Sequence, residues 1–344
     1  MNIGQQNLTE KNTIIAPENK RKQVNSLVLL RGIAALIVIF CHFGNPLTED
    51  PNFGNIFNFF HDYGLYGVQM FFVISGFVIP LSLDRSNYKL FNYPDFLKKR
   101  AFRLHPPYVA ALILTSVISY LAYKSKGLIY PENASSIAKS FFYLHFPADN
   151  PVFWTLGVEV TYYFFIGLLF PVFKKYPAIA VVVLIPLFAI ISKTAIVDYI
   201  VFFNLPMYFF IGIFGYFIYE KQNLTLNYAG LALSIIASFY LSDLIGTIVA
   251  IFTIAFIFFY NLRVPKFFNF LGEISYSVYL IHFVIGIKFI NLSIRYVNPS
   301  LYWALFIVAI IFIYAVSYVF YRIIEIPSAK LSNKVKYRKR PEEN

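Results

Sequence analysis

The sequence predicts an all-α, polytopic membrane protein with about ten transmembrane helices and with both termini in the cytoplasm. Of its 344 residues, 58% are hydrophobic and only 13% are charged, whereas soluble domains carry roughly 25% charged residues. Apolar runs long enough to cross a bilayer recur from about residue 25 to residue 321. The runs are continuous rather than alternating, which argues against an outer-membrane barrel.

Ten candidate spans follow from the ~20 apolar residues that a helix needs to cross the hydrocarbon. They are predicted at 25–44, 63–82, 106–123, 152–172, 177–192, 199–219, 228–243, 245–260, 274–292 and 300–321. Ser242, Asp243 and Gly246 mark a turn between two of the shorter spans. No segment between spans is long enough for a soluble catalytic domain, so any chemistry is expected inside the helical bundle.

The 29 Lys and Arg residues set the predicted orientation. With both termini inside, 22 of them fall in cytoplasmic segments and five in outside loops, which is the positive-inside pattern. This pattern accounts for the net charge of +12, so we expect no nucleic-acid partner and a contact of the basic tail with anionic lipid headgroups. The predicted division is a cytoplasmic N-terminal segment (1–23), a transmembrane domain (24–327) and a basic cytoplasmic tail (328–344).

Arg31 and His42 are the first candidate functional residues, because both are polar and both fall within the first span. A basic side chain deep in a span costs about 2.5–3.5 kcal/mol on insertion scales. Arg31 and His42 are eleven positions apart. In an α-helix, eleven residues turn through three full turns to within about 20° and rise about 16 Å along the axis, so the two side chains face the same way. The alternatives are that Arg31 snorkels to the cytoplasmic surface and that His42 caps a helix end.

Arg100 and Arg103 form a second basic pair, one helical turn apart just before the third span. Arginine forks match phosphate oxygens, so the pair could clamp an anion. Basic residues in this position also serve simply to orient a membrane protein, and this interpretation stays open.

Glu159 is the carboxylate that lies clearly within an apolar span, and it needs a partner or a proton there. Its depth is comparable with that of His42, so a contact between the two could orient the imidazole as a general base requires. Whether the two helices touch is left open at this point.

Small and polar residues mark two further helices. Ser75 and Gly76 fall in the middle of the second span, where close helix packing competes with a nucleophilic role for Ser75. Ser275, Tyr279 and His282 recur on one helix face and either line a cavity or bond to neighbouring helices.

Two further observations concern the end of the chain and the histidines. Glu325, after the last span, is expected simply to end its helix near Arg322. The scattered histidines lack metal-ligand spacing, so no metal site is expected.

In order and spacing, these motifs resemble the acyltransferase-3 family, integral membrane O-acyltransferases that modify bacterial surface polysaccharides. The resemblance covers about residues 24 to 330. The elements that carry it are Leu30 to His42, Gly67 to Phe77, Arg100 to Pro107, Trp154 to Glu159, Ser275 to His282, and Glu325 with Pro327. The chain departs from the family pattern at Val28, where many members have an acidic residue, and at Ile326, where relatives have arginine between the Glu and the Pro.

The resemblance implies an enzyme of the bacterial cytoplasmic (inner) membrane that transfers an acyl group, with acetyl as the expected group, from cytoplasmic acyl-CoA to a sugar hydroxyl of exopolysaccharide, lipopolysaccharide or a lipid-linked precursor. No bound cofactor is expected, because acyl-CoA is a co-substrate. Arg100 and Arg103 would bind the CoA phosphates, Arg31 the phosphate end or the pantetheine arm, and His42 would act as the general base beside Glu159. A transient acyl-histidine is a variant of this mechanism. The cavity is expected to be lined by Ser75, Trp154, Ser275, Tyr279 and His282.

Two other classes of protein fit the same residues. In a polysaccharide or lipid transporter, Arg31, His42 and Glu159 would line a translocation path instead of an active site. A non-catalytic assembly subunit is the third interpretation.

Overall fold

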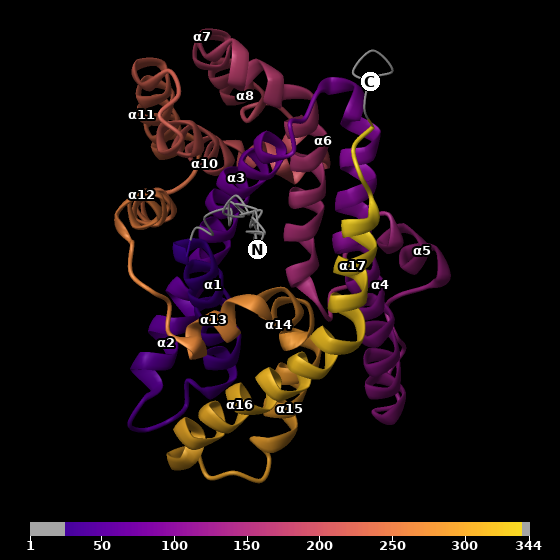
Figure 1. Ribbon diagram of the computed structural model, residues 1–344. Helices are drawn as coiled ribbons and strands as arrows, with labels where there is room; N and C mark the ends of the chain where they lie inside the picture. Colours follow the sequence, from indigo (N-terminus) through magenta and orange to yellow (C-terminus); the bar gives the residue numbers. More distant parts are fainter. Residues whose placement is uncertain (1–24, 339–344) are drawn as a thin grey trace, which may run out of the picture.

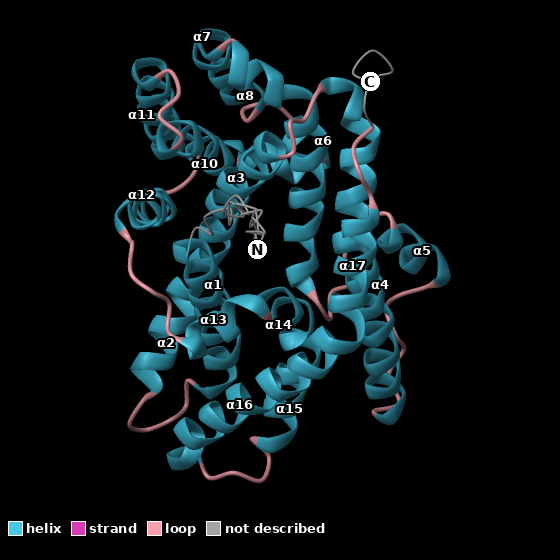
Figure 2. Cartoon of the chain, viewed as in Figure 1, coloured by secondary structure: helices cyan, strands magenta, loops and turns pink. Residues whose placement is uncertain are grey.

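A computed structural model describes residues 25–338 of the protein, and this part of the chain is all-helical, without a β-strand (Figures 1 and 2). The predicted segment 1–23 and the last residues of the basic tail lie outside the described range. The helices are α1 Asn25–Gly44, α2 Gly54–Tyr63, α3 Gly67–Arg85, α4 Tyr93–Ser125, α5 Ala134–Phe141, α6 Trp154–Lys175, α7 Pro177–Ile179, α8 Ile185–Ile191, α9 Ile196–Tyr199, α10 Pro206–Tyr219, α11 Leu224–Leu241, α12 Leu244–Phe259, α13 Lys266–Glu273, α14 Ser275–Ile281, α15 Lys288–Ser293, α16 Tyr302–Phe320 and α17 Ile326–Lys334.

Among the described residues, seven helices are long and apolar enough to cross a membrane. Three shorter apolar helices, Pro177–Ile191, Pro206–Tyr219 and Leu244–Phe259, stand where three further spans were predicted. The protein is therefore a multi-pass membrane protein. The count of ten spans and the side on which the termini lie stay predictions.

Helix α4 differs most from its predicted span. The sequence predicts a span at 106–123, because Pro106 and Pro107 commonly begin a helix, but α4 runs without interruption from Tyr93 to Ser125. Its extra turns carry the Arg100 and Arg103 pair, which is consequently part of the transmembrane helix itself rather than of a loop.

A hydroxyl group from α17 explains how α4 continues through its two prolines. Proline has no N–H, so the carbonyl groups four residues earlier, those of Phe102 and Arg103, lose their helical donors. The Ser328 hydroxyl lies 2.5 Å from the Phe102 carbonyl oxygen and 3.2 Å from the Arg103 carbonyl oxygen. In a membrane, such side-chain hydroxyls can replace the missing backbone donors.

Helix α6 uses the same device at its own proline. Pro171 leaves the Gly167 carbonyl without a helical donor, and the Tyr88 hydroxyl donates to that oxygen at 2.6 Å. These hydroxyl groups satisfy the backbone carbonyls, so α4 and α6 remain continuous in the region that holds the candidate site.

Further contacts fasten α17 and the chain after it to the start of α4, beside which α17 lies (Figure 1). The Ser332 hydroxyl donates to the Lys99 carbonyl at 2.8 Å, and Arg338 forms an ion pair with Asp95 at 3.3 Å. The C-terminal part of the described chain thus fixes the segment of α4 that bears the paired arginines.

Helices α3 and α10 approach each other closely at two glycines. A Cβ atom at Gly76 would lie 2.2 Å from the Phe209 carbonyl oxygen, and one at Gly212 would lie 2.2 Å from the Val73 carbonyl oxygen. Only glycine fits at such distances. Gly76 therefore has the packing role that the sequence suggested for it, and it holds the neighbouring Ser75 at a fixed depth.

Basic side chains collect at one end of the bundle, which we call the basic end and define by Lys98, Lys99, Lys174, Lys175 and Lys330. The start of α4, the end of α6 and helix α17 lie there, and positive-inside bias makes this the predicted cytoplasmic end. In Figure 1, α13 and α14 lie between the α1 and α3 side of the bundle and the α4 and α6 side.

Candidate functional site

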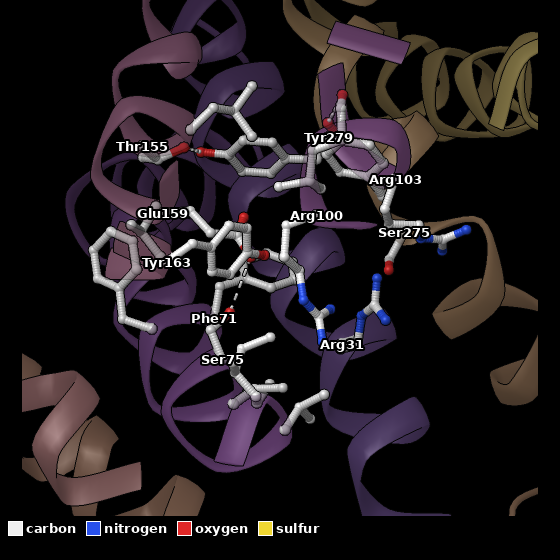
Figure 3. Close-up of a pocket in the computed structure, with 18 residues that line it drawn as sticks. Arg31, Phe71, Ser75, Arg100, Arg103, Thr155, Glu159, Tyr163, Ser275 and Tyr279 are labelled. Carbon is white, nitrogen blue, oxygen red and sulfur yellow. Dashed lines mark hydrogen bonds between the residues drawn. The ribbon is translucent and has the colours of Figure 1, made fainter. Parts of the chain in front are cut away.

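The central cavity of the bundle is enclosed by α1, α3, α4, α6 and α14 and has an empty volume of about 910 Å³ (Figure 3). Seven of the ten site residues predicted from the sequence line it: Arg31, Ser75, Arg100, Arg103, Glu159, Ser275 and Tyr279. Helices far apart in the sequence thus bring these residues together. The other three, His42, Trp154 and His282, are not part of this cavity wall.

Arg31 is partly buried and makes no hydrogen bond or ion pair with any other residue between 25 and 338. It lines the central cavity and also a second, outer cleft near the basic end. Arg103 borders both spaces as well, so the two guanidinium groups stand where the cleft and the cavity meet. An unpaired cation inside a membrane domain is costly, and an anionic ligand at this junction would offset that cost.

Arg100 is held in place by aromatic rings rather than by a carboxylate. Its guanidinium carbon lies 5.5 Å from the centre of the Phe96 ring and 5.7 Å from that of Tyr163, and Nη2 donates to the Ser82 hydroxyl at 3.0 Å. Its Nε is buried and has no hydrogen-bond partner among the described residues. In the view of Figure 3, Arg100 and Arg31 lie toward one end of the cavity, with Thr155 and Tyr279 toward the other.

Glu325 corrects an expectation, because it does more than end its helix. The side chain is fully buried and accepts a hydrogen bond from Arg103 Nη2 at 3.0 Å and one from the Ser277 hydroxyl at 2.6 Å. It therefore fixes the direction of Arg103. The sequence obscured this role, since a carboxylate just after an apolar span looks like an ordinary helix end.

Glu159 also differs from its expected role. Ser75 donates to its Oε1 at 3.2 Å and Tyr163 to the same oxygen at 2.5 Å. No contact joins Glu159 to His42, so the pairing considered from their similar depth is not found. The carboxylate lines the cavity, and its Oε2 forms no hydrogen bond with the described residues, so it can accept one from a ligand.

His42 lies near the end of α1 and packs against α14 and the π-helical turn that follows it. Its ring centre is 5.3 Å from that of His282 and 5.0 Å from that of Phe283, which meets it edge-on. No described residue forms a hydrogen bond to the His42 ring nitrogens. Neither ring nitrogen is therefore engaged by a described residue.

The protonation of His282 follows from its surroundings. Nδ1 lies 2.8 Å from the Tyr279 carbonyl oxygen, and because a carbonyl only accepts, Nδ1 carries the proton of the neutral ring. The lone pair is then on Nε2, which is buried and has no hydrogen-bond partner among the described residues. His282 also begins the π-helical turn His282–Ile287, and Glu325 ends another at Tyr321–Glu325. π-Helical turns are frequent at functional sites.

The Tyr279 side chain separates the cavity from the histidine pair. Tyr279 lines the cavity, and its ring centre is 5.8 Å from that of His282. Thr155 donates to the Val152 carbonyl at 2.8 Å, which leaves the Tyr279 hydroxyl to donate to Thr155 Oγ1 at 2.7 Å. Tyr279 thus shares the cavity wall with Arg31 and contacts His282, the neighbour of His42. Trp154 packs edge-on against Phe72, with ring centres 6.4 Å apart.

Three residues of the site were not identified from the sequence: Tyr163, Ser82 and Glu325, which position Glu159, Arg100 and Arg103 respectively. The first two have no distinctive spacing, and the third was assigned a lesser role. No group of three or more His, Cys, Asp or Glu side chains within residues 25–338 is arranged to hold a metal ion.

A multi-pass bundle with a charged, partly enclosed cavity defines a membrane protein with a polar site inside its helical bundle. The comparison with protein families identifies the class further: a family model described as "Acyltransferase domain" matches residues 24–322. The chain belongs to this acyltransferase-3 family.

One curated relative is similar over part of its length. Nodulation protein 10 of Rhizobium leguminosarum bv. viciae is 28% identical over 174 residues, which are 44% of this chain and 46% of that protein. The match therefore spans slightly less than half of the relative. No solved structure matches the chain.

Proposed function

We propose that the protein moves an acyl group, acetyl in the first instance, from acyl-CoA to a hydroxyl group of a cell-surface polysaccharide or its lipid-linked precursor. The observation that carries this proposal is the unpaired Arg31 at the junction of cleft and cavity, with Arg103 beside it and Arg100 nearby. CoA is elongated and anionic at one end. Its phosphates fit the arginine-lined junction, and its pantetheine arm fits the cavity beyond.

The outer cleft supports this direction of approach. It opens near the basic end, its wall includes Lys330 and Asn333 of α17, and Arg31 and Arg103 form its inner limit. With the basic end in the cytoplasm of a bacterial inner membrane, the donor reaches the arginines from the compartment that contains acyl-CoA. Inside the cavity, Glu159 Oε2 can accept a hydrogen bond from an amide N–H of the pantetheine arm.

We assign the role of general base to His42. Its free ring nitrogen takes the proton of the acceptor hydroxyl while that oxygen attacks the thioester carbonyl carbon. The carbon–sulfur bond then breaks, and the CoA thiolate takes the proton back from the imidazolium. The Nε2 lone pair of His282 can accept a hydrogen bond from His42 or from the acceptor, a role that the sequence led us to consider for Glu159.

Tyr279 stands between donor and base in this arrangement. We infer that its ring turns aside when the thioester occupies the end of the cavity, and that its hydroxyl group then donates to the carbonyl oxygen on which charge develops. The alternative in which His42 itself carries the acyl group uses the same residues.

Comparing surface glycans by mass spectrometry tests the proposal. The compared strains are cells with the gene, cells without it, and cells without it that carry a plasmid-borne copy. Their glycan unit should be heavier by the mass of one acyl group only in the two strains that make the protein. Identical glycans from all three strains, together with movement of a solute by vesicles containing the protein, would favour a transporter instead.

A further inference from the structure

A groove separate from the central cavity lies between α4 and α6. One stripe of α4 and one stripe of α6 form its walls, with Leu97, Lys98 and Ala101 on the first helix and Val160 and Phe164 on the second. Lys98, Ala101 and Phe164 are exposed, and both helices belong to candidate membrane spans. In a bilayer this groove therefore faces lipid rather than water.

The groove is bounded at both ends by specific contacts. Toward the basic end, the Tyr93 hydroxyl donates to the Phe164 carbonyl at 3.2 Å. Toward the other end, the Phe146 ring packs so close to α6 that a Cβ atom at Gly157 would lie 2.6 Å from it. The Tyr93 bond joins α4 to α6, whereas Phe146 reaches α6 from the loop between α5 and α6.

Tyr143 forms part of the groove in an unusual backbone conformation. Its φ angle is +60°, a region in which bulky residues are rare. Stacking on Tyr108, with ring centres 4.4 Å apart, and a hydroxyl contact of 3.2 Å to His105 Nδ1 hold it there. The fold maintains a tyrosine at a position that glycine or asparagine would occupy more easily, which indicates that its side chain is needed in the groove wall.

The inner wall of the groove is shared with the central cavity. Arg100, Leu104 and Tyr163 line both spaces. The buried Nε of Arg100 lacks a partner among the described residues, Lys98 adds a second cation, and no carboxylate lines the groove. Apart from His105 and two tyrosines the remaining wall is apolar, so the groove combines an exposed cation, Lys98, with a hydrophobic channel.

We propose that this groove binds an anionic phospholipid from the leaflet at the basic end, with its phosphate on the exposed Lys98 and one acyl chain against Ala101, Val160 and Phe164. Residues 97 to 105 extend about 12 Å along α4, a length that accommodates the upper part of a single acyl chain. A soluble anion would meet the cations but would leave the apolar channel uncovered. The proposal does not depend on acyl transfer.

A bulky side chain placed in the groove tests this proposal. Native mass spectrometry of the detergent-solubilised full chain measures which lipids stay bound. The probes are palmitoyl-oleoyl phosphatidylglycerol and the matching phosphatidylcholine. Each Lys or Arg near an anionic lipid contributes a factor of about five in affinity. The parent protein should therefore retain phosphatidylglycerol at least about fivefold better than phosphatidylcholine. Ala101→Trp should abolish this preference. The matched control is Ile113→Trp, on an exposed position of the same helix outside the groove, and it should preserve the preference. Equal retention by the two variants would overturn the proposal.

A crosslinking measurement keeps the proposal testable if the Trp variant does not fold. Photoreactive benzoylphenylalanine is placed at Ala101 or at Ile113 in vesicles that contain equal amounts of the two lipids. Adducts at Ala101 should be enriched in phosphatidylglycerol, adducts at Ile113 should reflect the vesicle composition, and Lys98→Gln should reduce the enrichment at Ala101 about fivefold. The same lipid ratio at both positions, or no effect of Lys98→Gln, would contradict the assignment.

Discussion

Neutralising Glu325 isolates the charge that positions Arg103. In Glu325→Gln, the amide keeps the shape of the carboxylate, and its oxygen can still accept from Arg103 while its NH₂ group donates to the Ser277 hydroxyl. The hydrogen bonds of 3.0 and 2.6 Å are thus replaceable, and what the substitution removes is the negative charge in a fully buried position.

The expected loss follows from the difference between charged and neutral hydrogen bonds. A hydrogen bond to a charged group contributes about 1.5–3 kcal/mol and a neutral one about 0.5–1.5 kcal/mol. The Arg103 side chain is 32% exposed, so solvent screens part of its charge and the lower end applies. We expect Glu325→Gln to reduce the free energy of unfolding by about 1 kcal/mol.

A double-mutant cycle of Glu325→Gln with Arg103→Gln, followed by reversible unfolding in mixed micelles, measures this effect. If the charge pair is responsible, Glu325→Gln should cost little when Arg103 is already neutral, which gives a coupling energy of about 1 kcal/mol. Glu273→Gln is the matched control, because Glu273 is exposed and accepts a bond from Asn269 that glutamine can also accept. A coupling energy of zero would refute the reasoning.

Further predictions concern donor binding and helix packing. Arg100→Ala and Arg103→Ala should each raise the Kd for acetyl-CoA about tenfold or more, because a charge-assisted bond is lost. The control variant Arg295→Ala, in a connecting loop, should leave the Kd unchanged. Titration calorimetry at two salt concentrations measures the Kd, and unchanged affinity in both variants would leave the arginines with an orienting role. Gly76→Ala should destabilise the protein by about 1–3 kcal/mol, because the new Cβ atom would lie 2.2 Å from the Phe209 carbonyl oxygen. The loss of stability should lower the yield of monodisperse protein in size-exclusion chromatography. A normal yield would be inconsistent with the packing described.

Residues in the interior of strongly apolar helices were predictable from the sequence. Helix α1 is helical from the first described residue, Asn25, and ends at the predicted residue, Gly44, where the apolar run reaches a polar limit. The cost of burying charge likewise singled out Arg31 and Glu159, and both face the cavity. A residue type that a membrane disfavours is informative without any knowledge of its neighbours.

Contacts between helices were not predictable in the same way. Similar depth suggested that Glu159 meets His42, but depth does not fix the rotation of a helix about its axis, and the neighbour of His42 is His282. The continuation of α4 through its prolines depends on a hydroxyl group from Ser328, more than two hundred residues later. Such long-range compensation cannot be recognised from local sequence.

Acetyl transfer by the purified protein in vesicles tests the central claim most directly. With radiolabelled acetyl-CoA and an extract of the native glycan acceptor, the parent protein should label the glycan, and His42→Ala, inserted and folded to the same extent, should do so at least about 10²-fold more slowly. Labelling by His42→Ala at the parental rate would contradict the assignment of this histidine as the base.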